Sequence, residues 1–510
     1  MTHRPSVWAL GAPLALSWLA CTPPPPPAPP TFVRTGLVTA AGEGRALADG
    51  RRYRQLAWAP GDRVDGAMAP RVAECIPLAS VGLGDLTQLV ARGISAPDTA
   101  LAFSPDGSGL AVGTYLGELL VLDGWTGEVR ARRTVAGSAI KRVAWSPDGT
   151  ELYAAEQSPD AVLRALDPRT LADRATFRLA DELESSAPPG ADDVYGLYTL
   201  PGAYGLEVAA DGSLVVVGAH GWNTPEGRRN RSRVWRLVRE GGAFVVRATW
   251  PDSPADATFL ALAMEGDHVA VSVSRSSPGP DPAGLPVGGV ALLDRTTLGL
   301  ERSLVPEPLA PWFDRAFVWE GIGLHGSRVT LGLGDGRVWR PDAGRDLGTP
   351  VMAGDVPIAA TIGHLVDGGD AVFAITSGTS IPYSASRPEL QPPEPHPQED
   401  TLFALDPDTL DTRWAWHGSE ALHGLTADGR WLVVGTGPKQ GDDDPGRYGA
   451  MVFDRQREGS GAERLAASCG TGRPVFFRTA IAPDGRIAVV SFPAKRGDAV
   501  TGAYEVALFL

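Results

Sequence analysis

Three histidines, His325, His364 and His423, are the side chains of this chain that could most readily form a metal site. Neutral imidazole is a common ligand of Zn²⁺ and other divalent ions, so three converging rings could hold one. The three do not occupy equivalent positions in the sequence repeats described below, and no cluster of acidic partners is obvious. Two interpretations therefore stay open: a divalent metal site, and histidines that only pack or form hydrogen bonds near a central channel.

Two charged segments and two aromatic residues are candidates for binding rather than for chemistry. The segment GWNTPEGRRNRSR contains Trp222, Arg228, Arg229, Arg231 and Arg233, and a second long segment contains Tyr383. The clustered guanidinium groups could bind a carboxylate-rich partner or lipid headgroups, although a solvated loop would carry the same residues. The three aspartates at 442–444 offer oxygen ligands for calcium, but their spacing matches no standard calcium loop, which favours a charged turn.

Motifs that would identify a reaction are absent from the sequence. It contains no GxSxG, no P-loop GK, no HExxH, no CxxC and no CxxCH haem attachment site. Three cysteines, one of them a candidate for lipidation, are too few for covalent haem or an iron–sulfur cluster. The net charge of −14 also disfavours a nucleic-acid-binding surface, because phosphate contacts need clustered Lys and Arg.

The elements that would position these candidates are short strands joined by turns, and they recur along the chain. The clearest copy is residues 101–129, where Pro, Asp and Gly of SPDG each favour a turn between apolar runs. The related sequences are LAFSPDG, VAWSPDG, LEVAADG, LALAMEGD, IGLHGS, IGHLVDGG, GLTADG and AIAPDG. From Asp106 to Asp484, 378 residues span seven intervals, so the mean period is 54 residues. This period predicts an all-β propeller of four-stranded antiparallel blades, with eight blades favoured and seven possible.

The repeats resemble those of bacterial WD-repeat-like and YVTN-type propellers, in the wider group that includes quinoprotein dehydrogenases. SPDG, LVLDGWTGEV and FALDPDTLDTRWAW carry the resemblance, which covers about residues 96–510. The chain has no Trp-Asp dipeptide, so it does not carry true WD repeats. Quinoprotein dehydrogenases need a cofactor pocket, often with calcium, but a single FALDPDTLDTRWAW copy is informative about structure alone. The resemblance thus implies a fold more strongly than an activity.

The last repeat ends in a strand at Tyr504–Leu510 and leaves no residues for an outer strand. Propellers commonly close by borrowing that strand from the N-terminal segment, and residues 72–80 are the natural donor. Cys75 would then lie on the closing blade, and Cys469 in the linker that enters it. We predict a Cys75–Cys469 disulfide in an oxidising compartment, the alternative being two buried free thiols.

The N-terminus has the features of an export signal. Residues 1–20 contain a weakly basic start and an apolar run, and LSWLAC, which ends at Cys21, resembles the lipobox of bacterial lipoproteins. The family prefers leucine where Trp18 stands, so an unlipidated signal is the alternative. The proline-rich linker in residues 21–35 would hold the folded part away from a membrane. We therefore expect a lipoprotein of the outer membrane or cell surface, with residues 36–95 leading into a propeller at 96–510.

The longest predicted connections fall on one face of the propeller. They are residues 221–233, 275–288, 379–400, 437–449 and 493–502, with the linkers 180–204 and 306–317. Long connections on one face of a repeat fold usually mark the binding face. We expect a monomeric binding module for a protein, peptide or glycan, without a confidently predicted cofactor. The alternatives are a lactonase-like or quinoprotein-like enzyme with its site at the channel mouth, and a structural component of an envelope assembly.

Overall fold

A computed structural model of the protein describes most of the chain from residue 43 onward. The described ranges are residues 43–46, 52–55, 72–91, 99–184, 200–225, 227–275, 281–307, 321–343, 346–349, 351–353, 356–380, 396, 398–418, 420–438, 448–496 and 499–510. Among these residues, no helix is both long and apolar enough to cross a membrane.

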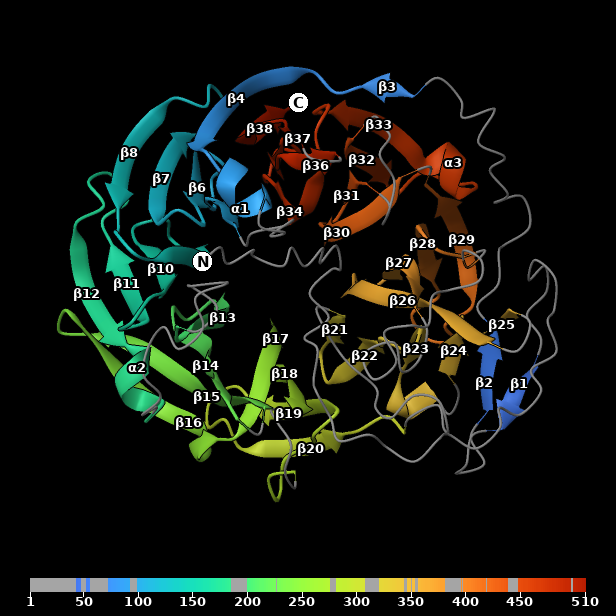
Figure 1. Ribbon diagram of the computed structural model, residues 1–510, viewed down its shortest axis with the longest axis horizontal. Coiled ribbons are helices and arrows are strands. Elements are labelled where there is room, and N and C mark those ends of the chain that lie inside the picture. Colours follow the sequence, from blue (N-terminus) through green and yellow to red (C-terminus); the bar gives the residue numbers. More distant parts are fainter. Residues whose placement is uncertain are drawn as a thin grey trace, which may run out of the picture.

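The described strands form eight blades of four antiparallel strands each, arranged in a ring (Figure 1). Blade one is β5 (Ala100–Phe103), β6 (Gly109–Gly113), β7 (Glu118–Asp123) and β8 (Val129–Thr134). Blade two is β9 (Ala139–Trp145), β10 (Leu152–Gln157), β11 (Val162–Leu166) and β12 (Asp173–Arg178). Blade three is β13 (Gly202–Val208), β14 (Leu214–Thr224), β15 (Gly227–Glu240) and β16 (Ala243–Ala255). Blade four is β17 (Ala257–Glu265), β18 (His268–Arg275), β19 (Gly289–Asp294) and β20 (Leu300–Leu304).

The other four blades complete the ring. Blade five is β21 (Ile322–His325), β22 (Arg328–Gly332), β23 (Arg337–Trp339) and β24 (Asp346–Gly348). Blade six is β26 (Val356–Asp367), β27 (Val372–Ser380), β28 (Thr401–Leu405) and β29 (Thr412–His417), with β25 (Val351–Ala353) beside β26. Blade seven is β30 (Ala421–Ala427), β31 (Trp431–Gly437), β32 (Gly449–Asp454) and β33 (Leu465–Gly470). Blade eight is β34 (Val475–Ile481), β35 (Ile487–Ser491), β38 (Tyr504–Phe509) and β4 (Pro77–Gly84). The predicted eight-bladed propeller is therefore confirmed.

The ring closes through the N-terminal segment, with two corrections to the expected boundaries. The closing strand is β4, which pairs antiparallel with β38 and begins later than the predicted range 72–80. Just before it, β3 (Ala73–Glu74) pairs in parallel with β33 and so extends blade seven. The predicted disulfide is present, with Cys75 and Cys469 Cα atoms 4.8 Å apart. Cys469 lies in β33, the outer strand of blade seven, rather than in the linker that follows it.

Further upstream, the N-terminal segment also extends blade five, the blade with the shortest repeat. β2 (Arg52–Gln55) pairs in parallel with β24, and β1 (Glu43–Ala46) pairs antiparallel with β2. The segment before the propeller thus adds strands to blades five, seven and eight (Figure 1).

Aspartate turns join the third and fourth strands of several blades. In blades one, two, four and six, an Asp Oδ1 atom accepts the N–H groups of the residues two and three positions later. The residue four positions later has a positive φ, and it is Gly127 in blade one but Leu171, Leu298 and Leu410 in the others. Short carboxylate side chains cap such turns locally, which explains why the aspartate recurs where the sequence of the turn otherwise varies.

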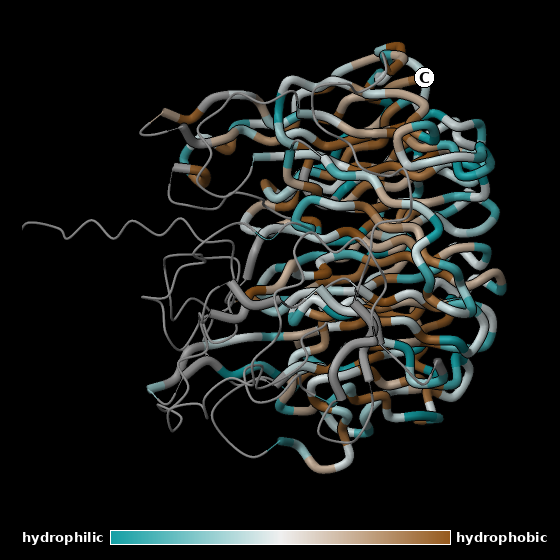
Figure 2. The backbone as a smooth tube through the Cα atoms, turned by 90° about the vertical axis from the view of Figure 1, so that its right-hand side faces the viewer, coloured by the Kyte–Doolittle hydropathy of each residue, from teal (hydrophilic) through white to brown (hydrophobic). Residues whose placement is uncertain are grey.

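The core lies between neighbouring blades, where strands bury both of their faces. Between blades two and three, for example, Leu163 packs with Leu206 and with Trp235, which is fully buried. The edge-on view shows hydrophobic strands in the middle of the ring and hydrophilic turns at one edge (Figure 2).

The alternation of antiparallel strands sorts the connections onto two faces of the ring. The turns after the first and third strands of each blade lie on one face, which we call the turn face. The connections after the second strands and between blades lie on the opposite face, which we call the insertion face. Its described elements include α1 (Thr87–Ala91), α2 (Leu179–Glu182) and the hairpin of β36 (Ala494–Arg496) with β37 (Ala499–Thr501). The short helix α3 (Gly461–Arg464) lies on the turn face, in the third turn of blade seven.

Candidate functional site

Blade three extends the insertion face with unusually long strands. β14, β15 and β16 contain 11, 14 and 13 residues, whereas their counterparts β6, β7 and β8 contain 5, 6 and 6. In the long hairpin Trp222 lies directly opposite Arg229, and the Trp222 ring contacts the buried His220 ring at 5.4 Å between centroids. Both Trp222 and Arg229 are partly exposed. The hairpin therefore presents an aromatic and a cationic side chain beyond the core of the blade.

The arginines of the hairpin do not act as one cluster. Arg231 donates a hydrogen bond of 2.5 Å to the Glu184 carbonyl and pairs with Asp256 at 3.4 Å. Arg233 is mostly buried and donates to Thr249 Oγ1 at 3.1 Å and to the Pro251 carbonyl at 3.3 Å. These two side chains bind parts of the same chain, and Arg229 is a further partly exposed member. The side chain of Arg228, and the residues Cys21, Tyr383 and Asp442–Asp444, lie outside the described part of the structure.

Two buried polar atoms near this hairpin lack hydrogen bonds within the described residues. They are Nδ2 of Asn230, whose residue is 6% exposed, and Oγ1 of Thr258, whose residue is 5% exposed. Leaving such a group unpaired costs about 1–3 kcal/mol unless water or a ligand supplies the bond. The insertion-face end of blades three and four is therefore a place where an added polar group would be stabilising.

The three histidines proposed as metal ligands are divided between two environments. His325 ends the innermost strand of blade five on the turn face, and its Nδ1 atom lies 3.1 Å from Glu265 Oε1. His364 and His423 lie on the innermost strands of blades six and seven and interact electrostatically. Burial, and secondarily repulsion from His364, lowers the pKa of His423 to about 3. Within the described ranges, no three His, Cys, Asp or Glu side chains are grouped so that they could hold a metal ion.

One carboxyl group on an innermost strand has a raised pKa. Burial raises the pKa of Glu207, on β13, to about 7, and the positive charge of Arg142 only partly opposes this shift. The Glu207 residue is partly exposed, and contact with water limits the cost of ionising it.

We expect Glu207→Gln to stabilise the protein in a pH-dependent way. A pKa raised above the ordinary 4.5 means that the folded state favours the protonated acid. Ionisation therefore costs stability from about pH 4.5 upward, and the full cost applies above about pH 7. The variant should gain about 1–3 kcal/mol in free energy of unfolding at pH 8 and nothing at pH 4. Urea unfolding at both pH values measures this, and an equal gain at both would contradict the assignment.

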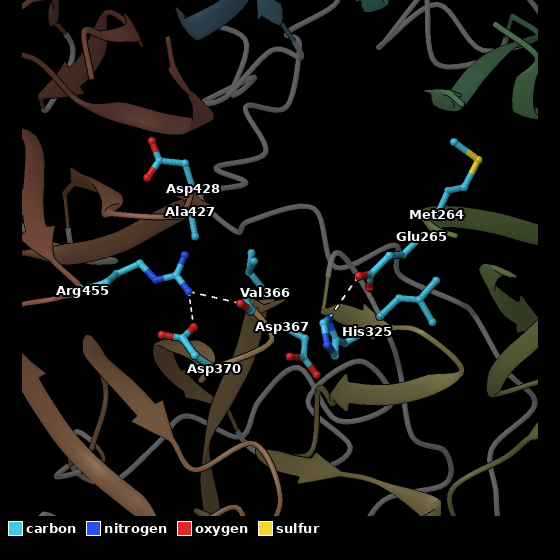
Figure 3. Close-up of a pocket in the computed structure, with 12 residues that line it drawn as sticks. Met264, Glu265, His325, Val366, Asp367, Asp370, Ala427, Asp428 and Arg455 are labelled. Atoms are coloured by element: carbon cyan, nitrogen blue, oxygen red, sulfur yellow. Dashed lines mark hydrogen bonds and ion pairs between the residues drawn. The ribbon is translucent and has the colours of Figure 1, made fainter. Parts of the chain in front are cut away.

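The turn face carries a cavity of about 510 Å³ that sequence analysis did not predict. It lies at the channel mouth and is lined by the first turns of blades four to seven (Figure 3). The lining residues are Met264, Glu265, Leu324, His325, Val366, Asp367, Gly368, Asp370, Ala427, Asp428, Gly429 and Arg455. The first turns of these blades are shorter than those of the other four, and this shortening is the signal in the sequence that could have revealed the cavity.

Ion pairs hold two of the carboxylates around the cavity. Asp367 is fully buried and pairs with Arg328 at 3.1 Å and with Arg340 at 3.8 Å. Asp370 pairs with Arg455, which reaches it from blade seven. By contrast, Asp428 Oδ1 accepts the backbone N–H groups of Arg430 and Trp431, and this carboxylate has no ion pair with any residue that the structure describes. The cavity therefore combines compensated and uncompensated negative charge.

Comparison with known proteins bears on the fold alone. No protein-family model and no curated protein sequence matches the chain. Among solved structures, the C-terminal WD40 domain of Sif2 has a TM-score of 0.50 at 12% identity, covering 86% of this chain and 99% of that one. The computationally designed Ika8 protein has the same TM-score and identity, covering 85% of this chain and all of its own. BamB from Moraxella catarrhalis has a TM-score of 0.46 at 14% identity, covering 86% and 98% of the two chains. The first two similarities agree with the observed propeller.

Proposed function

We propose that this protein is a binding module rather than an enzyme, tethered to the cell envelope through Cys21, and that its insertion face binds a protein partner. The observation that carries this proposal is the long hairpin of blade three, which places Trp222 opposite Arg229 at the insertion face. Trp and Arg are enriched among the residues that dominate protein–protein binding energies. Two unpaired polar atoms nearby, on Asn230 and Thr258, would gain hydrogen bonds from a partner or from water.

The tether rests on the N-terminal sequence. Cys21 ends a lipobox-like segment, and the proline-rich stretch after it would act as an extended spacer. A spacer of this kind gives a propeller room to bind a partner while its lipid anchor stays in the membrane. The disulfide between Cys75 and Cys469 is compatible with this location, since disulfides persist in oxidising compartments.

The proposal is tested with the full chain carrying Cys21→Ala. This variant should move from the membrane fraction to the supernatant, because it lacks the residue that would be lipidated. The released protein then serves as bait for envelope extracts, with and without Trp222→Ala. We expect Trp222→Ala to reduce capture of a partner at least about tenfold, which corresponds to an interface tryptophan worth ~1.4 kcal/mol or more.

Trp125→Ala is the matched control, because Trp125 is 49% exposed on the turn face of blade one. It should leave capture unchanged. A Cys21→Ala protein that stays with the membrane would argue against the lipid tether. Partner capture that is insensitive to Trp222→Ala, or equally sensitive to Trp125→Ala, would argue against the insertion face.

A further inference from the structure

The innermost strand of every blade carries a hydrophobic residue near its end at the turn face. The eight residues are Phe103, Trp145, Val208, Met264, Leu324, Val366, Ala427 and Ile481, and each is the last or the second-to-last residue that pairs with the next strand. The residue that follows is Ser or Ala in blades one, two, three and eight. In blades four to seven it is Glu265, His325, Asp367 and Asp428. Four consecutive blades thus place titratable side chains at one part of the channel mouth.

The first turns of the same four blades are shorter than those of the others. Between the last paired residues, blades one, two, three and eight have five or six turn residues, as in 104–109 and 482–486. Blades four to seven have only two to four, as in 266–267 and 428–431. The shorter turns leave the space of the cavity, and Met264, Leu324, Val366 and Ala427 are the apolar members of its lining.

Two carboxylates of the cavity have no arginine or lysine partner in the part of the chain described. Among the described residues, the Glu265 carboxylate pairs with His325 and accepts the N–H of Gly326. Asp428 uses Oδ1 for two backbone N–H groups, and its Oδ2 atom accepts no hydrogen bond from the described residues. Figure 3 shows the two side chains on opposite walls of the cavity. Separated carboxylates, together with apolar side chains in the same lining, match an aliphatic stem that ends in a cation.

Arg455 is a second and independent indication of a ligand. Its side chain is only 6% exposed, yet it lines the cavity, and its guanidinium is directed from the wall toward the middle (Figure 3). One terminal nitrogen donates to Asp370 and to the Gly368 carbonyl, at 3.2 Å from the latter. Its buried Nε–H has no acceptor among the described residues. A mostly buried guanidinium whose Nε–H is unused among the described residues favours a ligand that also carries carbonyl oxygens.

We propose that this turn-face cavity is a second binding site, which takes a lysine or arginine side chain from a peptide segment of a protein. The cation binds Glu265 or Asp428, the aliphatic stem packs on Met264 and its apolar neighbours, and backbone carbonyls of the segment accept from Arg455. The site lies on the face opposite Trp222, so it is separate from the insertion-face partner proposed above.

The test is a titration of the full Cys21→Ala chain with the peptide acetyl-Lys-Gly-Lys-amide, observed through ¹³C-labelled methionine methyl groups. The chain has five methionines, and the Met264 resonance is assigned with Met264→Leu. The lysine peptide should shift the Met264 signal with a Kd of about 1 mM or tighter, since short contacts of this kind are weak. The matching norleucine peptide should not shift it.

The double variant Glu265→Gln, Asp428→Asn removes both charges and keeps the oxygen acceptors of the turns. It should weaken the lysine peptide at least about tenfold (about 1.4 kcal/mol). Asp106→Asn is the matched control, because this aspartate serves the first turn of blade one outside the cavity. If the double variant does not fold, raising the salt concentration on the parent chain must weaken binding. The proposal fails if neither peptide shifts the Met264 signal or if both peptides shift it equally. It also fails if the double variant binds the lysine peptide as tightly as the parent chain does. Where that variant does not fold, the proposal fails if added salt leaves the affinity of the parent chain unchanged.

Discussion

Arg337→Met is expected to lower the free energy of unfolding by about 3–5 kcal/mol, because it leaves a buried charge without its partner. Arg337 and Asp335 are both 0% exposed, and the guanidinium donates to Asp335 Oδ2 at 2.7 and 2.9 Å. The same guanidinium donates to the Glu307 carbonyl at 2.6 Å. It therefore connects blade five to the linker that arrives from blade four on the insertion face. Urea unfolding followed by tryptophan fluorescence measures the loss.

The effect of Arg337→Met is separated from a general loss of arginine by two further variants. Arg247 pairs with Glu240 at the surface, with side chains 45% and 50% exposed, so Arg247→Met should cost less than about 1 kcal/mol. The double change Asp335→Ala, Arg337→Met removes both charges and should cost less than the single change. A loss below about 1 kcal/mol for Arg337→Met alone would show that Asp335 is not held as an uncompensated buried charge.

Loss of the Cys75–Cys469 disulfide is expected to cost about 2–4 kcal/mol. The two cysteines are 394 residues apart in sequence, so the bond restricts the unfolded chain over almost the whole propeller. It also holds the segment between β3 and the closing strand β4 against the outer strand of blade seven. Cys75→Ala with Cys469→Ala should lower the urea midpoint, and the closing strand should remain paired because β4 has its own ladder with β38.

A reducing agent provides the control for this prediction. It should lower the urea midpoint of the parent chain and leave the double cysteine variant unchanged. Cys21→Ala should not alter stability, because Cys21 takes no part in this bond. If the reducing agent does not change the urea midpoint of the parent chain, the disulfide does not contribute to stability.

The repeats made the fold predictable because each copy carries its own local signals. Turn residues such as Pro105, Asp106 and Gly107 act on neighbours close in sequence, and apolar runs between them have the length of short strands. The last repeat has no residues for an outer strand, and this indicated that an N-terminal strand closes the ring. Its boundary was displaced by a few residues, because residues 73–74 pair with blade seven instead.

The residues that could do chemistry were harder to place, because their surroundings come from different blades. His325, His364 and His423 follow one another along the chain, yet His325 pairs with Glu265 while the other two lie together near the channel. Arg231 and Arg233 looked like part of a free basic cluster, but they bind carbonyl and carboxylate groups of the same chain. Such contacts depend on how strands pack side by side, and local spacing does not report that.

By itself, the sequence determined the propeller fold and indicated the origin of its closing strand, and it favoured eight blades and a bond between Cys75 and Cys469. These features follow from periodicity and from counting strands and thiols. Only the tertiary structure decided which side chains share a site. The turn-face cavity exists because four consecutive blades have short turns, and Glu265 and Asp428 face each other across it although 162 residues separate them. Ring closure brings such residues together, and that is a property of the whole fold.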